Sequence, residues 1–414
     1  MRSMTRPPID KGGTMSTKRF TKDFTLQEPI PQAGVETAMA VMASGKLHRY
    51  NVAPGEKGEA ALLEEAFAAY MGKPYCLALA SCGSAMYIAL KSAGVCPGDK
   101  VLCNAYTLAP VPGAIENTGA EILLVDIVDD YTIDLVDLET KAADPDAKWF
   151  LLSHMRGHIA DMDRIMEICN THGLVLIEDC AHTMGALWNQ KKSGSFGKAG
   201  CFSTQTYKHM NSGEGGLLVT DDPDLAARAI ILSGSYMLYE RHTARPDLEV
   251  FEALKTMVPN YSSRMDNLRA GLLRPQLADL DRQCRRWNQR HDRLARGLKA
   301  IPGVFVPERN PKEAYVGSSI QFSLPGSTES QIQAFLSLCM TRGVELKWFG
   351  SKEPVGFTSA YDSWKYLGDL PDLPNTRRIL AVMCDMRIPL TFSLEDCDLI
   401  IDIIADTANE ILNP

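Results

Sequence analysis

The sequence predicts an α/β fold: a large domain with a mostly parallel central sheet, followed by a smaller α+β domain. Short apolar runs alternate with helical patterns through the first 265 residues. Several of these runs are almost continuously apolar, which is typical of strands buried on both faces. The alternation stops after residue 265, where one long helical stretch begins. Strands that alternate with helices favour a parallel sheet, because each helix carries the chain back to the same end of the sheet.

The expected elements follow in chain order. The expected strands of the first half are 101–106, 121–127, 149–154, 174–179, 200–204 and 216–220. The expected helices among them are 59–72, 84–95, 161–173 and 223–234. In the second half, a strand is expected at 318–326 and helices at 327–343 and 393–412. We therefore predict a large domain at 25–265, a long connecting helix at 266–303 and a small domain at 304–414.

Residues 1–24 are expected to form a disordered tail. The segment lacks the apolar stretch of a secretory signal, and Met15 is an alternative start. No apolar run approaches the roughly 20 residues that a membrane helix needs. We therefore expect neither secretion nor a membrane anchor.

The net charge of the chain excludes some classes of ligand, and its cysteine content indicates the cellular compartment. The formal charge of -8 opposes binding to nucleic acid or to anionic membranes, since both would repel the chain at long range. The eleven cysteines are scattered without CxxC pairs, which indicates reduced thiols and a cytoplasmic location. Small molecules are the expected ligands.

Three polar stretches should meet at the carboxyl edge of the sheet, where parallel α/β folds bind ligands. ASCGSAM (80–86) leads into a helix whose exposed N–H groups suit a phosphate, with Gly83 allowing close approach. LIEDCAHTMGA (176–186) places Asp179 at a strand end with His182 one helical turn beyond. CFSTQTYKHMNSGEGG (201–216) presents Lys208 in a loop after Ser203.

Each stretch alone also has an ordinary structural interpretation: a tight turn, a helix cap and a solvated lysine. Together they supply a phosphate cradle, a carboxylate and an amine. Those are the groups needed to hold pyridoxal 5'-phosphate (PLP) as a lysine Schiff base with an acid on its ring nitrogen.

The chain also resembles the DegT/DnrJ/StrS aminotransferases, PLP-dependent enzymes of fold type I. The resemblance runs from about residue 25 to the C-terminus. It is carried by blocks in family order: 44–51 (SGKLHRYN), 80–90, 94–101, 176–186, 193–220, 264–277 and 387–404. It implies a homodimer with the active site at the subunit interface and an amino acid donor such as glutamate or glutamine. The implied acceptor is a keto-sugar or a sugar-like ketone.

The resemblance also assigns roles to residues of this chain. Lys208 would form the Schiff base, and Asp179 would pair with the pyridine nitrogen. Gly83, Ser84 and Ser203 would hold the phosphate.

Further contacts are implied on the cofactor ring and across the dimer. Tyr106 would lie against the ring face and His182 would contact the ring hydroxyl. The partner subunit would reach the phosphate through Asn260 or Ser262, since the family's asparagine aligns with Ser262.

Two other functions remain open at this point. Some relatives have histidine in place of the lysine and dehydrate keto-sugars, and His209 is adjacent here. The count of five residues from Ser203 and six to Glu214 places Lys208 in the reactive position.

The second alternative is a metalloenzyme that uses no PLP. His154, His158 and His182 could bind zinc or iron together with Asp179. In either case Arg156 and Arg241 could bind a carboxylate or a phosphate, or could be structural.

Overall fold

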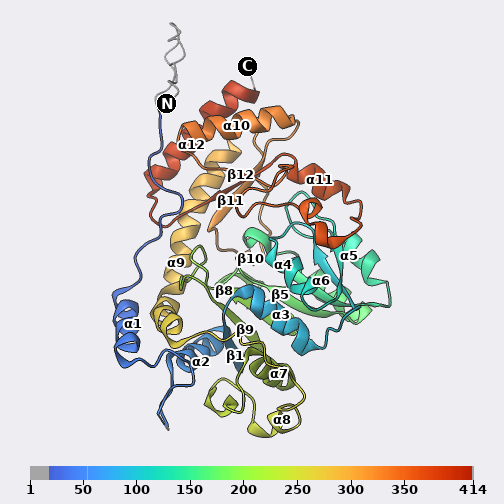
Figure 1. Ribbon diagram of the computed structural model, residues 1–414. Helices are drawn as coiled ribbons and strands as arrows, with labels where there is room; N and C mark the ends of the chain where they lie inside the picture. Colours follow the sequence, from blue (N-terminus) through green and yellow to red (C-terminus); the bar gives the residue numbers. More distant parts are fainter. Residues whose placement is uncertain (1–17, 54, 413–414) are drawn as a thin grey trace, which may run out of the picture.

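The structure is a computed structural model that describes residues 18–53 and 55–412 (Figure 1). Met15 and most of the expected tail lie outside these residues. Phe20 and Phe24 are only 2% and 4% exposed, and both rings pack edge-on against Phe392 at 4.9 Å. The prediction of a disordered tail is therefore wrong for residues 20–24, because these two aromatic side chains are buried in the small domain.

A seven-stranded sheet forms the centre of the large domain. Its strands, in spatial order, are β1 (Tyr75–Leu79), β9 (Gly216–Thr220), β8 (Ala199–Ser203), β5 (Val175–Asp179), β4 (Ala147–Ser153), β2 (Lys100–Asn104) and β3 (Glu121–Val125). Only β9 runs antiparallel to its neighbours in this sheet. The predicted mostly parallel sheet is confirmed. The edge strand β1 was not predicted.

Helices cover both faces of this sheet. One face packs against α2 (Glu59–Met71), α5 (Leu135–Ala142) and α6 (Met162–His172). The other packs against α3 (Cys82–Ala93), α4 (Pro110–Glu116) and α7 (Pro223–Ser233), with α8 (Leu248–Glu252) beside α7. The side chains of β1 alternate between these two faces. Cys76 and Ala78 pack in the core on the α2 side, and Leu77 and Leu79 pack in the core on the α3 side. A strand buried on both faces reads as a continuous apolar run.

The helix α9 (Asn267–Lys299) connects the two domains and continues through Pro275. Its first half contacts α1 (Gln32–Ser44) and α2, and its far end contacts α12 (Leu394–Leu412) of the small domain. Figure 1 shows α9 in gold, running from beside α1 and α2 up to α10 and α12. The long helix predicted at 266–303 is present and ends four residues early.

The small domain is built on an antiparallel sheet of β11 (Ser319–Ser323), β13 (Met383–Arg387) and β12 (Lys347–Trp348). Its helices are α10 (Glu329–Thr341), α11 (Pro374–Leu380) and α12. One face of the sheet is apolar and forms the domain core, with Ile320, Phe322, Cys384 and Met386. The alternate residues form a polar face that contacts the large domain. A further small sheet contains β10 (Glu313–Ala314), β6 (Leu187–Trp188) and β7 (Lys191–Lys192).

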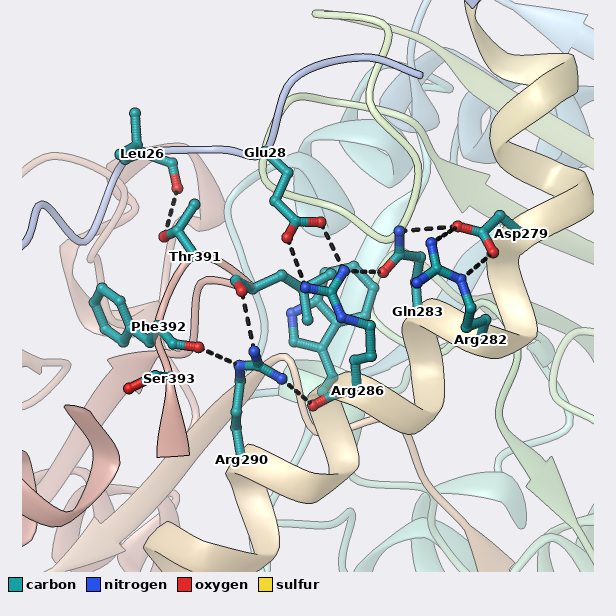
Figure 2. Close-up of polar contacts among 12 residues, drawn as sticks. Leu26, Glu28, Asp279, Arg282, Gln283, Arg286, Arg290, Thr391, Phe392 and Ser393 are labelled. Carbon is teal, nitrogen blue, oxygen red and sulfur yellow. Dashed lines mark hydrogen bonds and ion pairs between the residues drawn. The ribbon is translucent and has the colours of Figure 1, made fainter. Parts of the chain in front are cut away.

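The arginines of α9 are used in contacts within the chain (Figure 2). The guanidinium of Arg286 donates to both carboxylate oxygens of Glu28, at 2.7 and 2.6 Å. Arg290 donates to the carbonyls of Leu390 and Phe392. These contacts fasten the N-terminal segment and the chain after β13 to the same side of α9, so this face of the helix is part of the fold.

No helix within residues 18–53 and 55–412 is both long and apolar enough to span a membrane. All eleven cysteines lie in the described part of the chain, and all carry free thiols.

Candidate active site

A cavity of about 340 Å³ lies at the carboxyl edge of the large sheet, closed on its far side by the small domain. Five of the predicted site residues line it: Gly83, Asp179, His182, Ser203 and Lys208. The structure therefore brings together the three stretches that the sequence placed at this edge. Ser84 and Tyr106 do not line the cavity.

Asp179 ends β5 and forms the floor of the cavity, with 4% of its surface exposed. One carboxylate oxygen accepts a hydrogen bond from the Ser153 hydroxyl at 2.7 Å, and the other accepts from the Ala181 backbone N–H at 3.1 Å. Ser153 ends the neighbouring strand β4. The carboxylate is thus fixed in orientation, as a group that pairs with a ligand cation must be.

Lys208 lies in the loop between β8 and β9, which is closed by backbone hydrogen bonds from Thr204 to Gly215 and from Thr206 to Gly213. Its amine is 2.7 Å from His182 Nε2. Burial, with the nearby charge of Arg156, lowers the pKa of Lys208 to about 8. About a tenth of the amine is therefore uncharged at pH 7, far more than for an ordinary lysine, and the uncharged form is the nucleophile.

His182 is arranged to hold that neutral amine. Burial, with the charge of Lys208, holds the pKa of His182 well below its ordinary value, so the ring is neutral. The backbone N–H of Arg156 donates to Nδ1 at 3.4 Å, which leaves the ring hydrogen on Nε2. Nε2–H can then donate to the lone pair of the Lys208 amine.

His209 points away from the cavity. Its Nε2 is 3.1 Å from the Ser318 hydroxyl, and its ring packs edge-on to Trp287 at 5.1 Å. Burial, with the charge of Lys208, lowers the pKa of His209 to about 3. Lys208, and not its neighbour, presents its side chain to the cavity.

The turn before α3 has room for an anion. Ser81 caps the helix, since its hydroxyl accepts from the Ser84 N–H at 3.0 Å. A Cβ built on Gly83 would meet nothing closer than 3.7 Å, so packing does not demand a glycine there. A Cβ on Gly216 would lie 2.3 Å from the Ser81 carbonyl, so there a glycine is needed to bring β9 against the turn. The open space before Gly83 fits a phosphate at a helix N-terminus.

Tyr106 is found in the core between the domains. It is 1% exposed, and its ring packs edge-on to Phe349 at 5.4 Å. Leu108, two residues later, lines the cavity instead. The position expected at the cofactor face is therefore occupied by an aliphatic side chain, because the chain turns after β2 and buries Tyr106.

The three histidines of the alternative metal site belong to separate networks. His158 Nε2 is 2.7 Å from Gln321, whereas His182 contacts Lys208. Within the described residues, one group with metal-ligand chemistry comes together: His154, Glu178 and Cys180. The Glu178 carboxylate already accepts three backbone N–H bonds, from Gly194, Phe196 and Gly197. The geometry makes this a structural cluster that orders the loop before β8.

Four polar residues of the site were missed or left undecided by the sequence. Ser153, which orients Asp179, follows an apolar run that gave no sign of its partner. Arg156 lines the cavity in a left-handed backbone conformation (φ 55°), and it forms an ion pair with Asp385 at 2.8 Å. Lys347 and Arg387 reach the cavity from the small domain. The sequence pointed to segments 153–158 and 346–351 as parts of the pocket, but it assigned no role to Ser153 or Lys347.

Arg241, the other undecided arginine, has a structural role. It donates to the Tyr50 carbonyl. Tyr50 is buried, but most of the 44–51 block to which it belongs is exposed, and no residue of that block lines the cavity.

Comparison with known proteins gives a consistent result. Residues 36–405 match the DegT/DnrJ/EryC1/StrS aminotransferase family. The spore coat polysaccharide biosynthesis protein SpsC of Bacillus subtilis is 33% identical over 248 residues, which cover 59% of this chain and 62% of that protein. The chain thus spans less than two thirds of the length of that relative.

Two further similarities are broader. The dTDP-3-amino-3,4,6-trideoxy-alpha-D-glucose transaminase of Streptomyces venezuelae is 32% identical over 69% of this chain and 71% of its own. The crystal structure of 3-amino-5-hydroxybenzoic acid synthase superposes with a TM-score of 0.79 at 26% identity, covering 93% of this chain and 98% of that one.

Proposed function

Because the chain belongs to the DegT/DnrJ/EryC1/StrS aminotransferase family, we propose that it is a PLP-dependent aminotransferase acting on a keto-sugar or sugar-like ketone. The amino donor is an amino acid such as glutamate or glutamine. The observation that carries the proposal is the Lys208 amine, held in a cavity between a fixed carboxylate and a helix N-terminus.

The residues present fit the cofactor. Lys208 would attach it covalently, Asp179 would face its ring nitrogen, and the turn at Gly83 together with Ser203 would take its phosphate. His182 is close enough to Lys208 to reach the ring hydroxyl. Bound PLP supplies an electron sink for the electron pair of the donor's α-carbon.

The chain itself performs the proton transfers. Once displaced by the donor, the Lys208 amine would be the base that takes the donor's α-proton and the acid that gives a proton back. The Asp179 carboxylate would hold the proton of the cofactor's ring nitrogen by pairing with its charge. Residues of the small domain, among them Ser318, Lys347 and Arg387, form one wall of the cavity.

Covalent trapping tests the proposal. Purified protein supplied with PLP should turn yellow, and borohydride should then fix the cofactor to the peptide that contains Lys208, as read by mass spectrometry. A protein that takes up no PLP, or that is labelled at another lysine, would rule the proposal out. Sugar dehydration is disfavoured, because that reaction in relatives uses a histidine at the position that Lys208 occupies here.

We expect Arg156→Gln to shift the pH dependence of PLP uptake upward. The charge of Arg156 contributes to the lowered pKa of Lys208, and its removal stabilises the ammonium form. Asp385 would lose its ion-pair partner, which acts in the same direction. Stopped-flow measurement of cofactor uptake against pH should give a midpoint near pH 8 for the natural protein. An unchanged or lower midpoint in the variant would contradict this account of the Lys208 pKa.

We further propose that the protein is a homodimer whose partner subunit reaches the phosphate through Asn260. Four large apolar side chains are exposed beside Asn260 and Ser262: Tyr236 (57%), Met237 (55%), Met257 (79%) and Tyr261 (38%). Their two segments meet at Gly234, where a Cβ would lie 2.9 Å from Asn260 Oδ1. Apolar surface gathered in this way supports a subunit interface.

A double variant tests the dimer. Met237→Asp with Met257→Asp should convert the protein to monomers in sedimentation velocity and weaken PLP binding, because both side chains are exposed in the single chain. Val136→Asp is the matched control, since Val136 is also highly exposed (76%) but lies at the start of α5. Monomers in the natural protein, or a double variant that stays dimeric, would disprove this interface.

A further inference from the structure

The polar face of the small-domain sheet carries two cations into the cavity. Lys347 of β12 pairs in register with Asp385 of β13, and Arg387 lies two residues beyond Asp385. Residues at this spacing share one face of a strand. The opposite face is the apolar core, so these three side chains point away from it. Lys347 and Arg387 both line the cavity that contains Lys208.

The only acid on this face is already engaged. Asp385 forms its ion pair with Arg156 and accepts a hydrogen bond from Gln321 at 2.7 Å. In the part of the chain that the structure describes, no carboxylate lies within ion-pair distance of Lys347 or Arg387. Burial lowers the pKa of both cations, which shows that their charge is poorly solvated. Such charges are costly unless an anion binds beside them.

Arg387 is also fixed next to the reactive lysine. Its guanidinium carbon lies 3.6 Å from the centre of the Tyr207 ring, and Tyr207 directly precedes Lys208. A guanidinium placed over an aromatic ring can still use its outer N–H groups to bind both oxygens of a carboxylate. The cofactor phosphate has its own place at the start of α3, which is formed by other residues.

We propose that Arg387 and Lys347 form an anion subsite for the carboxylate of each reactant, so that the ketone acceptor is itself an acid. This rests on the proposed function. Donor and acceptor occupy the same side of the same cofactor in turn. Cations that pair with the donor's carboxylate would be left buried without a partner when a neutral ketone binds. An acceptor with a carboxylate in the equivalent position avoids that cost.

Glutarate is a suitable probe, because it carries the carboxylates of glutamate but has no amino or keto group to react. It should bind the PLP-loaded enzyme in calorimetry, and Arg387→Gln or Lys347→Met should weaken its affinity by roughly 10- to 100-fold, the loss of one charge-assisted contact. Arg378→Gln, on the exposed surface of α11, is the matched control and should bind glutarate normally.

PLP uptake and glutarate binding together distinguish a failure of the anion subsite from a failure of the proposed function. If the natural protein and both variants take up PLP at Lys208 and bind glutarate equally, the subsite is disproved and the aminotransferase stands. If the variants dissociate the dimer instead of losing glutarate, the cations serve the partner subunit and the subsite is likewise disproved. A protein that takes up no PLP fails the proposed function itself.

The test of the acceptor uses two ketones that differ by one carboxylate group. Enzyme first loaded with the amino group by glutamate is mixed with 3-oxocyclohexanecarboxylate or with cyclohexanone, and return of the yellow colour is followed in a single turnover. We expect the acid to react at least about 10-fold faster and Arg387→Gln to abolish most of that preference. Equal rates with both ketones in the natural protein would overturn the acidic acceptor.

Discussion

Replacing Lys208 with alanine should lower amino transfer by about 10⁴-fold or more, the largest effect we expect from any single substitution. The Lys208 amine is the group that we propose both attaches the cofactor and moves the α-proton. Alanine keeps the loop, whose conformation depends on backbone hydrogen bonds between Thr204 and Gly215. The variant should still bind PLP weakly through Asp179 and the turn at Gly83.

Single-turnover absorbance and borohydride labelling measure this effect. His209→Gln is the matched control: His209 does not line the cavity and its ring packs against Ser318 and Trp287, so the variant should keep most of its activity and its label on Lys208. If the histidine variant lost activity while Lys208→Ala kept it, the reaction would depend on His209, and amino transfer through Lys208 would be excluded.

Replacing Glu64 with glutamine should destabilise the fold by about 3–5 kcal/mol. Glu64 is fully buried on α2 and pairs with both terminal nitrogens of Arg49, at 2.9 and 2.8 Å. It also accepts from the Ala78 backbone N–H at 2.7 Å and contacts His242 at 3.2 Å. Glutamine would leave the buried guanidinium without a counter-charge. Urea denaturation followed by fluorescence would measure the loss.

The same group predicts a dependence of stability on pH. Burial alone would raise the pKa of Glu64, but the charge of Arg49, with His242, lowers it from 4.5 to about 2. A carboxyl with a lowered pKa contributes stability above its unfolded pKa and loses it as the pH falls. The natural protein should therefore lose this contribution between about pH 4.5 and 2, and Glu64→Gln should not.

A double variant separates charge burial from packing. Arg49→Met with Glu64→Leu removes both charges and should recover part of the stability that Glu64→Gln loses. If Glu64→Gln were as stable as the natural protein, the buried ion pair would contribute nothing to the free energy of unfolding. The exposed pair of Lys57, just before α2, and Glu65, on α2, is the control, since its loss should cost less than about 1 kcal/mol.

An element could be predicted wherever its own residues show an apolar run or an amphipathic pattern. Six strands of the large sheet and the helices α2, α3, α6 and α7 that cover it were expected within a few residues, because each is a continuous apolar or amphipathic segment. The helix α1, which packs on α9 instead of on the sheet, was not expected. Strand β1 was missed because its pairing partner β9 lies about 140 residues away and its own five residues follow a helix directly. Short elements such as α4 and α8 carry too few turns to show a period.

The residues of the candidate site also fall into those that the sequence could place and those that it could not. Asp179, Ser203 and Lys208 end or follow strands, so topology alone brings them to one edge. The direction of a side chain after a strand is not encoded locally, which is why Tyr106 was assigned to the cavity and Leu108 was not. The subsite cations come from a second domain. Sequence spacing could not relate them to Lys208.

The antiparallel strand β9 also has a consequence for assembly. Strands β5, β8 and β9 are neighbours in space and in sequence, so Asp179, Ser203 and Lys208 can meet by closing short loops. Strand β1 and the turn at Gly83 must join them from more than a hundred residues earlier, at a much larger loop-closure cost. The phosphate of bound PLP would then connect β1 and the Gly83 turn, which join the sheet late in folding, to β5, β8 and β9, which form early. Amide hydrogens of β1 and α3 should exchange fastest in the cofactor-free sheet, and PLP should slow their exchange more than that of β5.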